Sequence, residues 1–223
     1  MTQSVEVAAQ EPGGVLSTLD ELLRKPDAGF ARARAGAPIG GWAIRVFAGS
    51  LGCCVLYGAG SGFFAGGAQI GIAAVNAPLI VAWSALLCVP SLYVFGLLAG
   101  AALTRARFIV TLIGFVGMLA LVLVGLLPIE WLFSVSTHSL AFVVWLHLAL
   151  WGIAVVFGAR FLRAALPEMP ASAVLLWLAL FCVVCFQVTT FMRPTLWREP
   201  NAPVVEGGKL FFLDHFSQAL RAR

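Results

Sequence analysis

From Val46 to Thr104 the chain reads VFAGSLGCCVLYGAGSGFFAGGAQIGIAAVNAPLIVAWSALLCVPSLYVFGLLAGAALT, 59 residues without one Asp, Glu, Lys or Arg. A helix rises ~1.5 Å per residue and the hydrocarbon core of a bilayer is ~30 Å thick, so this stretch can cross a membrane twice. Between Val46 and Met192 only six residues are charged, and they divide the apolar segment into lengths that match a bilayer: Arg105, Arg107, Glu130, Arg160, Arg163 and Glu168. The stretch therefore predicts a membrane-spanning helical fold.

The composition of the whole chain supports this interpretation. Hydrophobic residues make up 61% of the 223 residues and charged residues only 11%, whereas about 25% of the residues of soluble domains are charged. The first apolar stretch begins far from the N-terminus and continues into a second one, so it is not a secretory signal peptide. A net charge of +4, without a dense Lys/Arg run, fits contact with lipid headgroups, and we expect no nucleic-acid partner.

We expect an all-α, polytopic transmembrane helix bundle of about five spans. Glycines followed by Pro78 mark the first break, Pro128 ends the third span, and Pro167 and Pro170 bracket the last loop. The expected spans are residues 43–64, 77–103, 108–127, 140–161 and 171–192. The transmembrane domain then covers residues 42–192, between an N-terminal tail of residues 1–41 and a C-terminal tail of residues 193–223.

Lysine and arginine are distributed unevenly over the short loops. They occur in the N-terminal segment and in the second and fourth loops, whereas the first and third loops have none. The positive-inside rule therefore places the N-terminus in the cytoplasm of a multi-pass plasma (inner) membrane protein. An odd number of spans puts the C-terminal tail outside although it is basic, so the side of that tail stays open.

Both tails contain apolar residues at helical spacing, which predicts a short amphipathic helix on the membrane surface at each end. In the N-terminal tail, Thr18 and Glu21 also have the spacing of a capping box. The apolar positions are Val15, Leu19, Leu22 and Leu23 in the first tail, and Leu210, Leu213, Phe216 and Leu220 in the second.

Glycines recur at intervals of four in the first span, at Gly58, Gly62 and Gly66. Small residues at that spacing let another helix approach closely, which is how helices gain packing energy in lipid. The approaching helix belongs either to the same chain or to a second copy in a dimer.

The second span contains Pro78 and Pro90. An internal proline kinks a helix, and in transporters such a break can mark a substrate site, although most kinks only shape the helix. We expect no carboxylate inside any span, because Glu130 lies at a predicted boundary beside Trp131. This absence argues against a proton relay.

His147 is the one ionisable group well inside an expected span, and Gln187 is a second candidate for an intramembrane polar site. A lone histidine is a poor metal site, so His147 is either a proton carrier or a neutral side chain bonded to a neighbouring helix. Cys182 and Cys185 have C-x-x-C spacing, but among Phe, Val and Leu they are better explained as packing residues. We therefore expect no catalytic residue, cofactor or metal.

The placed spans resemble a family of uncharacterised bacterial multi-pass proteins whose layout is similar to that of the YIP family. The resemblance rests on Ala77-Pro78, Pro90-Ser91-Leu92-Tyr93, Gly100, Pro128-Ile129, Gln187, a turn at Arg193-Pro194, and Phe211, Phe212 and Phe216. After that turn the chain has Thr195 and Leu196 where the family pattern has an aromatic residue and a glycine. The resemblance implies five spans, a cytoplasmic N-terminus and no established chemistry.

Two functional hypotheses follow. The first is a non-enzymatic assembly, scaffold or membrane-organising protein that acts through helix packing, with the lipid bilayer, a membrane-protein partner or a homo-oligomer as its contacts. The alternative is a small transporter or channel subunit, indicated by Pro90, His147, Gln187 and the polar turn before Asn76. The sequence indicates no small-molecule substrate.

Overall fold

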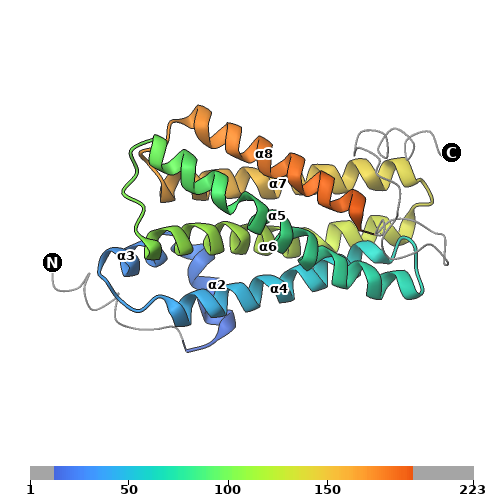
Figure 1. Cartoon of the computed structure of the whole chain (residues 1–223). Coiled ribbons are helices and arrows are strands. Elements are labelled where there is room, and N and C mark those ends of the chain that lie inside the picture. The colour runs from blue at the N-terminus through green and yellow to red at the C-terminus, as the bar shows by residue number, and fades with distance from the viewer. Residues whose placement is uncertain (1–12, 193–223) are drawn as a thin grey trace.

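The computed structural model describes residues 13–192, which form helices and turns without a strand in that range (Figure 1). The described residues form seven helices: α2 (Val15–Arg24), α3 (Ala28–Arg34), α4 (Gly40–Gly62), α5 (Ala68–Leu98), α6 (Arg105–Ser136), α7 (Leu140–Ala165) and α8 (Ala171–Phe191). Five of them, α4 to α8, are long and apolar enough to cross a membrane. The prediction of an all-α bundle is confirmed, and the chain has the architecture of a multi-pass integral membrane protein.

Successive long helices run in opposite directions along the bundle (Figure 1). The connections from α5 to α6 and from α7 to α8 lie at the same end of the bundle as α2 and α3, on the left of the view. We call this the basic end, because within residues 13–192 it holds every lysine and arginine: Arg24, Lys25, Arg32, Arg34, Arg45, Arg105, Arg107, Arg160 and Arg163. The opposite end, with the turns after α4 and α6, is called the far end.

The turn between α4 and α5 is much shorter than expected. Gly66 and Gly67 have φ angles of 74° and 55°, a left-handed conformation that glycine adopts without strain, and α5 begins directly after them at Ala68. The expected start at residue 77 is therefore wrong, and Pro78 lies inside the helix. Asn76, assigned to a polar turn from the sequence, is buried within α5.

The third long helix also extends beyond its expected bounds. We expected Pro128 to end it, but α6 continues through Pro128 to Ser136. Proline is tolerated in membrane helices because neighbouring helices and local adjustments satisfy the freed carbonyl. As a result, Glu130 lies inside α6 and is fully buried. The expectation that every span lacks an internal carboxylate is corrected here.

The core lies around α6, which packs against α4 on one side and α7 on another. Two glycines make the α6–α7 crossing close, each opposite a phenylalanine of the other helix. A Cβ on Gly114 would meet the Phe161 ring, and a Cβ on Gly158 would lie 2.7 Å from the Phe115 ring. Phe115 in turn meets Trp177 of α8 edge to face, at 5.2 Å between ring centroids.

The N-terminal amphipathic stretch forms α2, which packs Leu19 and Leu22 against α4 and α6 and leaves Val15 and Leu23 exposed. Leu19 fits against Gly49 and Leu22 against Gly117. Glu21 accepts hydrogen bonds from the buried Arg32 of α3 at 2.7 and 3.0 Å. The expected capping box of Thr18 and Glu21 is wrong, because α2 begins at Val15 and both residues lie inside the helix, where the Thr18 hydroxyl donates to the Gly14 carbonyl.

The helix expected around residues 210–220 and the turn at Arg193-Pro194 lie outside the described residues.

Candidate intramembrane site

Side chains from three helices meet near the far end of the bundle. Tyr57 lies near the end of α4, Glu130 near the end of α6 and His147 near the start of α7. The Nδ1 atom of His147 is 3.2 Å from the hydroxyl of Tyr57 and 3.1 Å from Oε1 of Glu130. We call these three residues the Glu130 cluster.

The cluster is buried to different degrees. The Glu130 side chain has no exposed surface, Tyr57 is 2% exposed and the His147 side chain is 25% exposed. An unpaired charge in such surroundings is costly, so buried ionisable groups are paired or neutral. His147 is therefore the least buried member of the cluster.

Polar atoms around the cluster have unused hydrogen-bonding capacity. Within the described residues, Oε2 of Glu130, the hydroxyl of Ser134 and the indole nitrogen of Trp151 are buried without a hydrogen-bond partner. The Trp151 ring also lies 6.3 Å from the His147 ring. Unsatisfied polar atoms in a buried place call for an explanation, such as a functional role or a bound water.

The Tyr57 hydroxyl and the Glu130 carboxyl group both lie within hydrogen-bond distance of Nδ1 of His147. The position of the proton on these groups determines which of them donates. If Nδ1 of His147 carries a proton, it donates to the Glu130 carboxylate. If Nδ1 is bare, it accepts from the Tyr57 hydroxyl or from a protonated Glu130. The arrangement can therefore hold one proton in alternative positions across three helices, which is the property of a proton relay.

The sequence indicated His147 but missed its partners. In the sequence, Pro128 predicts a helix end just before Glu130 and so places Glu130 at a boundary, and nothing in the sequence distinguishes Tyr57. One signal was available: Glu130 and His147 lie on either side of a short turn, so in a helical hairpin they reach similar depths. Tyr57, 90 residues before His147 in the chain, gave no comparable signal.

The three glycines of the first span have different places. Gly58 and Gly62 lie against α5: a Cβ on Gly62 would be 2.8 Å from the Cα of Ile70, and one on Gly58 would meet the backbone of Ala73. Gly66 lies in the turn with open space around it. The packing partner of Gly58 and Gly62 in this structure is therefore a helix of the same chain.

The two prolines of α5 lie apart from the cluster. Pro78 lines a shallow apolar groove of about 280 Å³ together with residues of α4 and α6. Pro90 precedes Ser91, whose hydroxyl accepts a hydrogen bond from the Trp177 indole at 3.1 Å and donates to the Cys88 carbonyl at 2.8 Å. Ser91 thus links α5 to α8.

Gln187 is not part of the cluster. Its amide nitrogen donates to Thr190 of the same helix at 3.3 Å, and its buried oxygen has no partner among the described residues. Cys182 and Cys185 are free thiols in α8. Within residues 13–192, no group of three or more His, Cys, Asp or Glu side chains is placed to hold a metal ion.

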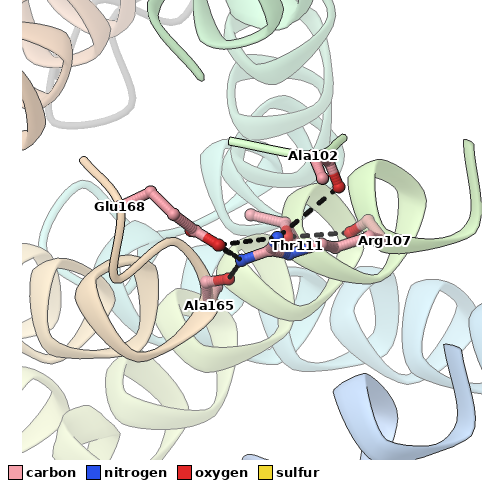
Figure 2. A network of polar contacts seen from close by, with 5 residues as sticks. All are labelled: Ala102, Arg107, Thr111, Ala165 and Glu168. Carbon is pink, nitrogen blue, oxygen red and sulfur yellow. Dashed lines mark hydrogen bonds and ion pairs between the residues drawn. The ribbon is translucent and has the colours of Figure 1, made fainter. Parts of the chain in front are cut away.

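A second polar network lies at the basic end (Figure 2). The Arg107 guanidinium donates to both carboxylate oxygens of Glu168, at 2.8 and 3.0 Å, and to the Ala165 carbonyl at 2.9 Å. The hydrogen bonds from Arg107 lower the pKa of Glu168 below its ordinary value. The network ties the start of α6 to the end of α7.

No family model, no curated protein and no solved structure matches this chain. The resemblance to a YIP-like layout therefore stays a prediction.

Proposed function

We propose that this integral membrane protein is a small, non-enzymatic transporter or channel subunit that moves protons through the Glu130 cluster. The observation that carries the proposal is the fully buried Glu130 bonded to His147, whose nitrogen is shared with Tyr57. Ionisable groups inside membrane helices are expensive and typically mark ion or proton pathways.

The packing of the glycines also bears on the choice between the two hypotheses. The glycines of α4 suggested an assembly protein, yet Gly58 and Gly62 are already covered by α5. On the apolar side of α2, Leu19 and Leu22 are likewise buried against α4 and α6, whereas Val15 and Leu23 are exposed. Gly58 and Gly62, which motivated an assembly role, therefore have a partner inside the chain, whereas the helix expected around residues 210–220 lies outside the described residues. His147 has two partners that suit proton transfer.

The test is proton flux into liposomes. The purified full chain is reconstituted into vesicles that contain a pH-sensitive dye, and a potassium diffusion potential drives protons inward. We expect faster acidification than in empty vesicles, and a return to the empty-vesicle rate for Glu130→Gln, which keeps the shape of the side chain but cannot ionise.

Glu168→Gln is the matched control, because it makes the same chemical change at the basic end. We expect it to keep the wild-type flux. A wild-type rate equal to that of empty vesicles, or a Glu130→Gln variant as active as Glu168→Gln, would contradict the proposal.

A second candidate function is assembly with a membrane-protein partner or a second copy through α7. Of the five long helices, α7 is the least buried, because only 17% of its apolar membrane-crossing stretch lies inside the bundle. On its outer side, Ala149 and Gly152 are exposed, and a Cβ on Gly152 would meet nothing within 4 Å. Another helix could therefore approach α7 closely there.

Disulfide crosslinking in native membranes tests this second candidate. A cysteine at Ala149 should give a covalent dimer or adduct if α7 forms an interface. A cysteine at Ala154, which is fully buried inside the bundle, and the wild-type chain are the controls. Equal crosslinking in all three would exclude an interface on this side of α7.

We further propose that the basic end faces the cytoplasm of the plasma membrane, since lysine and arginine favour that side. Ala68→Cys, exposed at the start of α5 at the far end, should then react with a membrane-impermeant thiol reagent added to intact cells, and Ala35→Cys, exposed at the basic end, should not.

A further inference from the structure

We propose that the basic end carries a binding site for a phosphate group, in a hollow between α7 and α8 that is separate from the Glu130 cluster. The hollow has a volume of about 420 Å³ and is lined by Arg160, Arg163, Ala164, Pro167, Met169 and Ala171. Two of its six lining residues are arginines, whose guanidinium groups suit phosphate oxygens better than any other side chain does.

Neither arginine is neutralised within the protein. Arg160 and Arg163 are exposed, and within residues 13–192 neither forms an ion pair with a carboxylate. The guanidinium of Arg160 lies 5.8 Å from the centre of the Phe157 ring, which orients it and leaves its N–H groups free to donate. Three residues apart on one helix, the two side chains reach the same hollow.

The carboxylate that adjoins the hollow in sequence, between the lining residues Pro167 and Met169, is already engaged elsewhere. Glu168 lies in the connection between α7 and α8, but Arg107 holds both of its oxygens from the other side (Figure 2). Arg34 also lies close enough to act on the charge of Glu168. Arg107 and Arg34 therefore offset the charge of Glu168, so it is not needed to explain the two arginines of the hollow.

The start of α8 adds to this charge. Ala171 is both the first residue of α8 and part of the wall of the hollow, and Pro170 before it provides no side-chain cap. The first backbone N–H groups of a helix carry a partial positive charge that favours an anion. This contribution is secondary to that of the two arginines.

The phosphate can belong to a phospholipid headgroup or to a free phosphate. A lipid source fits the position of the hollow, since Arg160 and Arg163 lie in the last turns of a helix that is long enough to cross a membrane. Basic hollows between membrane helices at this level bind anionic headgroups in other proteins. The shared chemistry is a phosphate anion held by two guanidinium groups.

Native mass spectrometry of the full chain, released from a neutral detergent, tests the site. The protein is titrated in separate arms with phosphatidylglycerol, with phosphatidylcholine and with inorganic phosphate. We expect phosphatidylglycerol to bind more tightly than phosphatidylcholine, and the double variant Arg160→Gln, Arg163→Gln to weaken its binding about tenfold, or ~1.4 kcal/mol.

The matched control removes two positive charges from the same end but away from the hollow. Lys25 and Arg105 are exposed, form no ion pair among the described residues and do not line the hollow. The variant Lys25→Gln, Arg105→Gln should weaken phosphatidylglycerol binding less than about threefold. Its two positive charges lie outside the hollow, and salt screens the attraction between an exposed charge and a distant headgroup. Circular dichroism checks that both double variants keep their helices.

Each outcome has a clear consequence. Loss of phosphatidylglycerol binding in the hollow variant alone supports a lipid headgroup site, and displacement of the lipid by inorganic phosphate supports a site for the free anion. Equal losses in the two double variants, or equal affinities of the wild type for the two lipids, would overturn the proposal.

Discussion

At the far end of the bundle Glu130 pairs with His147 at 3.1 Å and has no exposed surface, whereas at the basic end Glu168 pairs with Arg107 at 2.8 Å and is 37% exposed. Each pair joins a carboxylate to a nitrogen base on a neighbouring helix. A pair with an exposed partner contributes little, because water solvates Glu168 and screens its attraction to Arg107. Water cannot solvate the groups of a buried pair, so the loss of one partner leaves the other buried without a hydrogen-bond or charge partner. The two pairs therefore differ in burial and in the base, which is a permanently charged guanidinium at the basic end and an imidazole at the far end.

The largest expected effect comes from removal of the buried carboxylate. Glu130→Ala should lower the free energy of unfolding by about 3 kcal/mol, because His147 and Tyr57 lose their partner in a buried place. The measurement is unfolding in mixed micelles by titration with a denaturing detergent. Glu168→Ala is the control at the basic end, with an expected loss under ~1 kcal/mol. Equal losses would remove the distinction between the two ends.

Close helix packing near the far end should be the next most sensitive feature. Gly58→Ala places a Cβ against the backbone of Ala73 and 2.7 Å from the Cβ of Ala77, so α4 and α5 must separate at a cost of about 2 kcal/mol. Gly52→Ala on the same helix has nothing within 4 Å of the new Cβ and should be neutral or stabilising by up to ~1 kcal/mol. If both variants unfold alike, α4 and α5 are not closely packed at Gly58.

A smaller effect is expected for the third member of the cluster. Tyr57→Phe keeps the ring and removes only the hydroxyl that lies 3.2 Å from His147, so we expect a loss of about 1 kcal/mol. Tyr93→Phe is the control, because Tyr93 is exposed and its hydroxyl makes no hydrogen bond in the described part of the chain. A loss as large as that of Glu130→Ala would mean that Tyr57 is the main partner of His147.

The smallest effect concerns the pH dependence of the basic end. Arg107 lowers the pKa of Glu168 in the folded protein, so the folded state binds this proton less readily than the unfolded chain. The stabilisation is present above the ordinary glutamate pKa and is lost as the pH falls through the lowered value. Because Glu168 is more than a third exposed, we expect less than ~1 kcal/mol.

Thermal melts of the wild type between neutral pH and pH 3 check this prediction. The difference in stability between the wild type and Glu168→Gln should shrink as the pH falls, because both side chains are then uncharged. A difference that does not change with pH would show that the Arg107 bridge does not depend on the charge of Glu168.

The long apolar segments predicted the helices well, because burial of backbone polar groups in lipid leaves few alternatives to a helix. The ends of the helices were less predictable. Gly66 and Gly67 alone make the first turn, so nine residues assigned to the loop belong to α5. Pro128 resembles a helix end in the sequence, but neighbouring helices allow α6 to pass through it.

The candidate site was predictable only in part. His147 was identified because an ionisable residue inside an apolar segment is conspicuous. Its partners were not identified, because their proximity depends on how α4, α6 and α7 cross. One of those crossings is defined by two close contacts, of Gly114 with Phe161 and of Gly158 with Phe115. The spacing of residues within either helix does not predict these contacts.

By itself, the sequence determined that this chain is a helical membrane protein with five long apolar segments and that its positive charges gather at alternate connections. Hydrophobic length and loop charge are local properties, so they can be read from 59 uncharged residues and the loops that follow. Only the tertiary structure decided that Gly58 and Gly62 face α5, that Glu130 is buried and that Tyr57 and His147 complete its cluster. Those facts depend on contacts between helices far apart in the chain, and such contacts arise only when the helices pack.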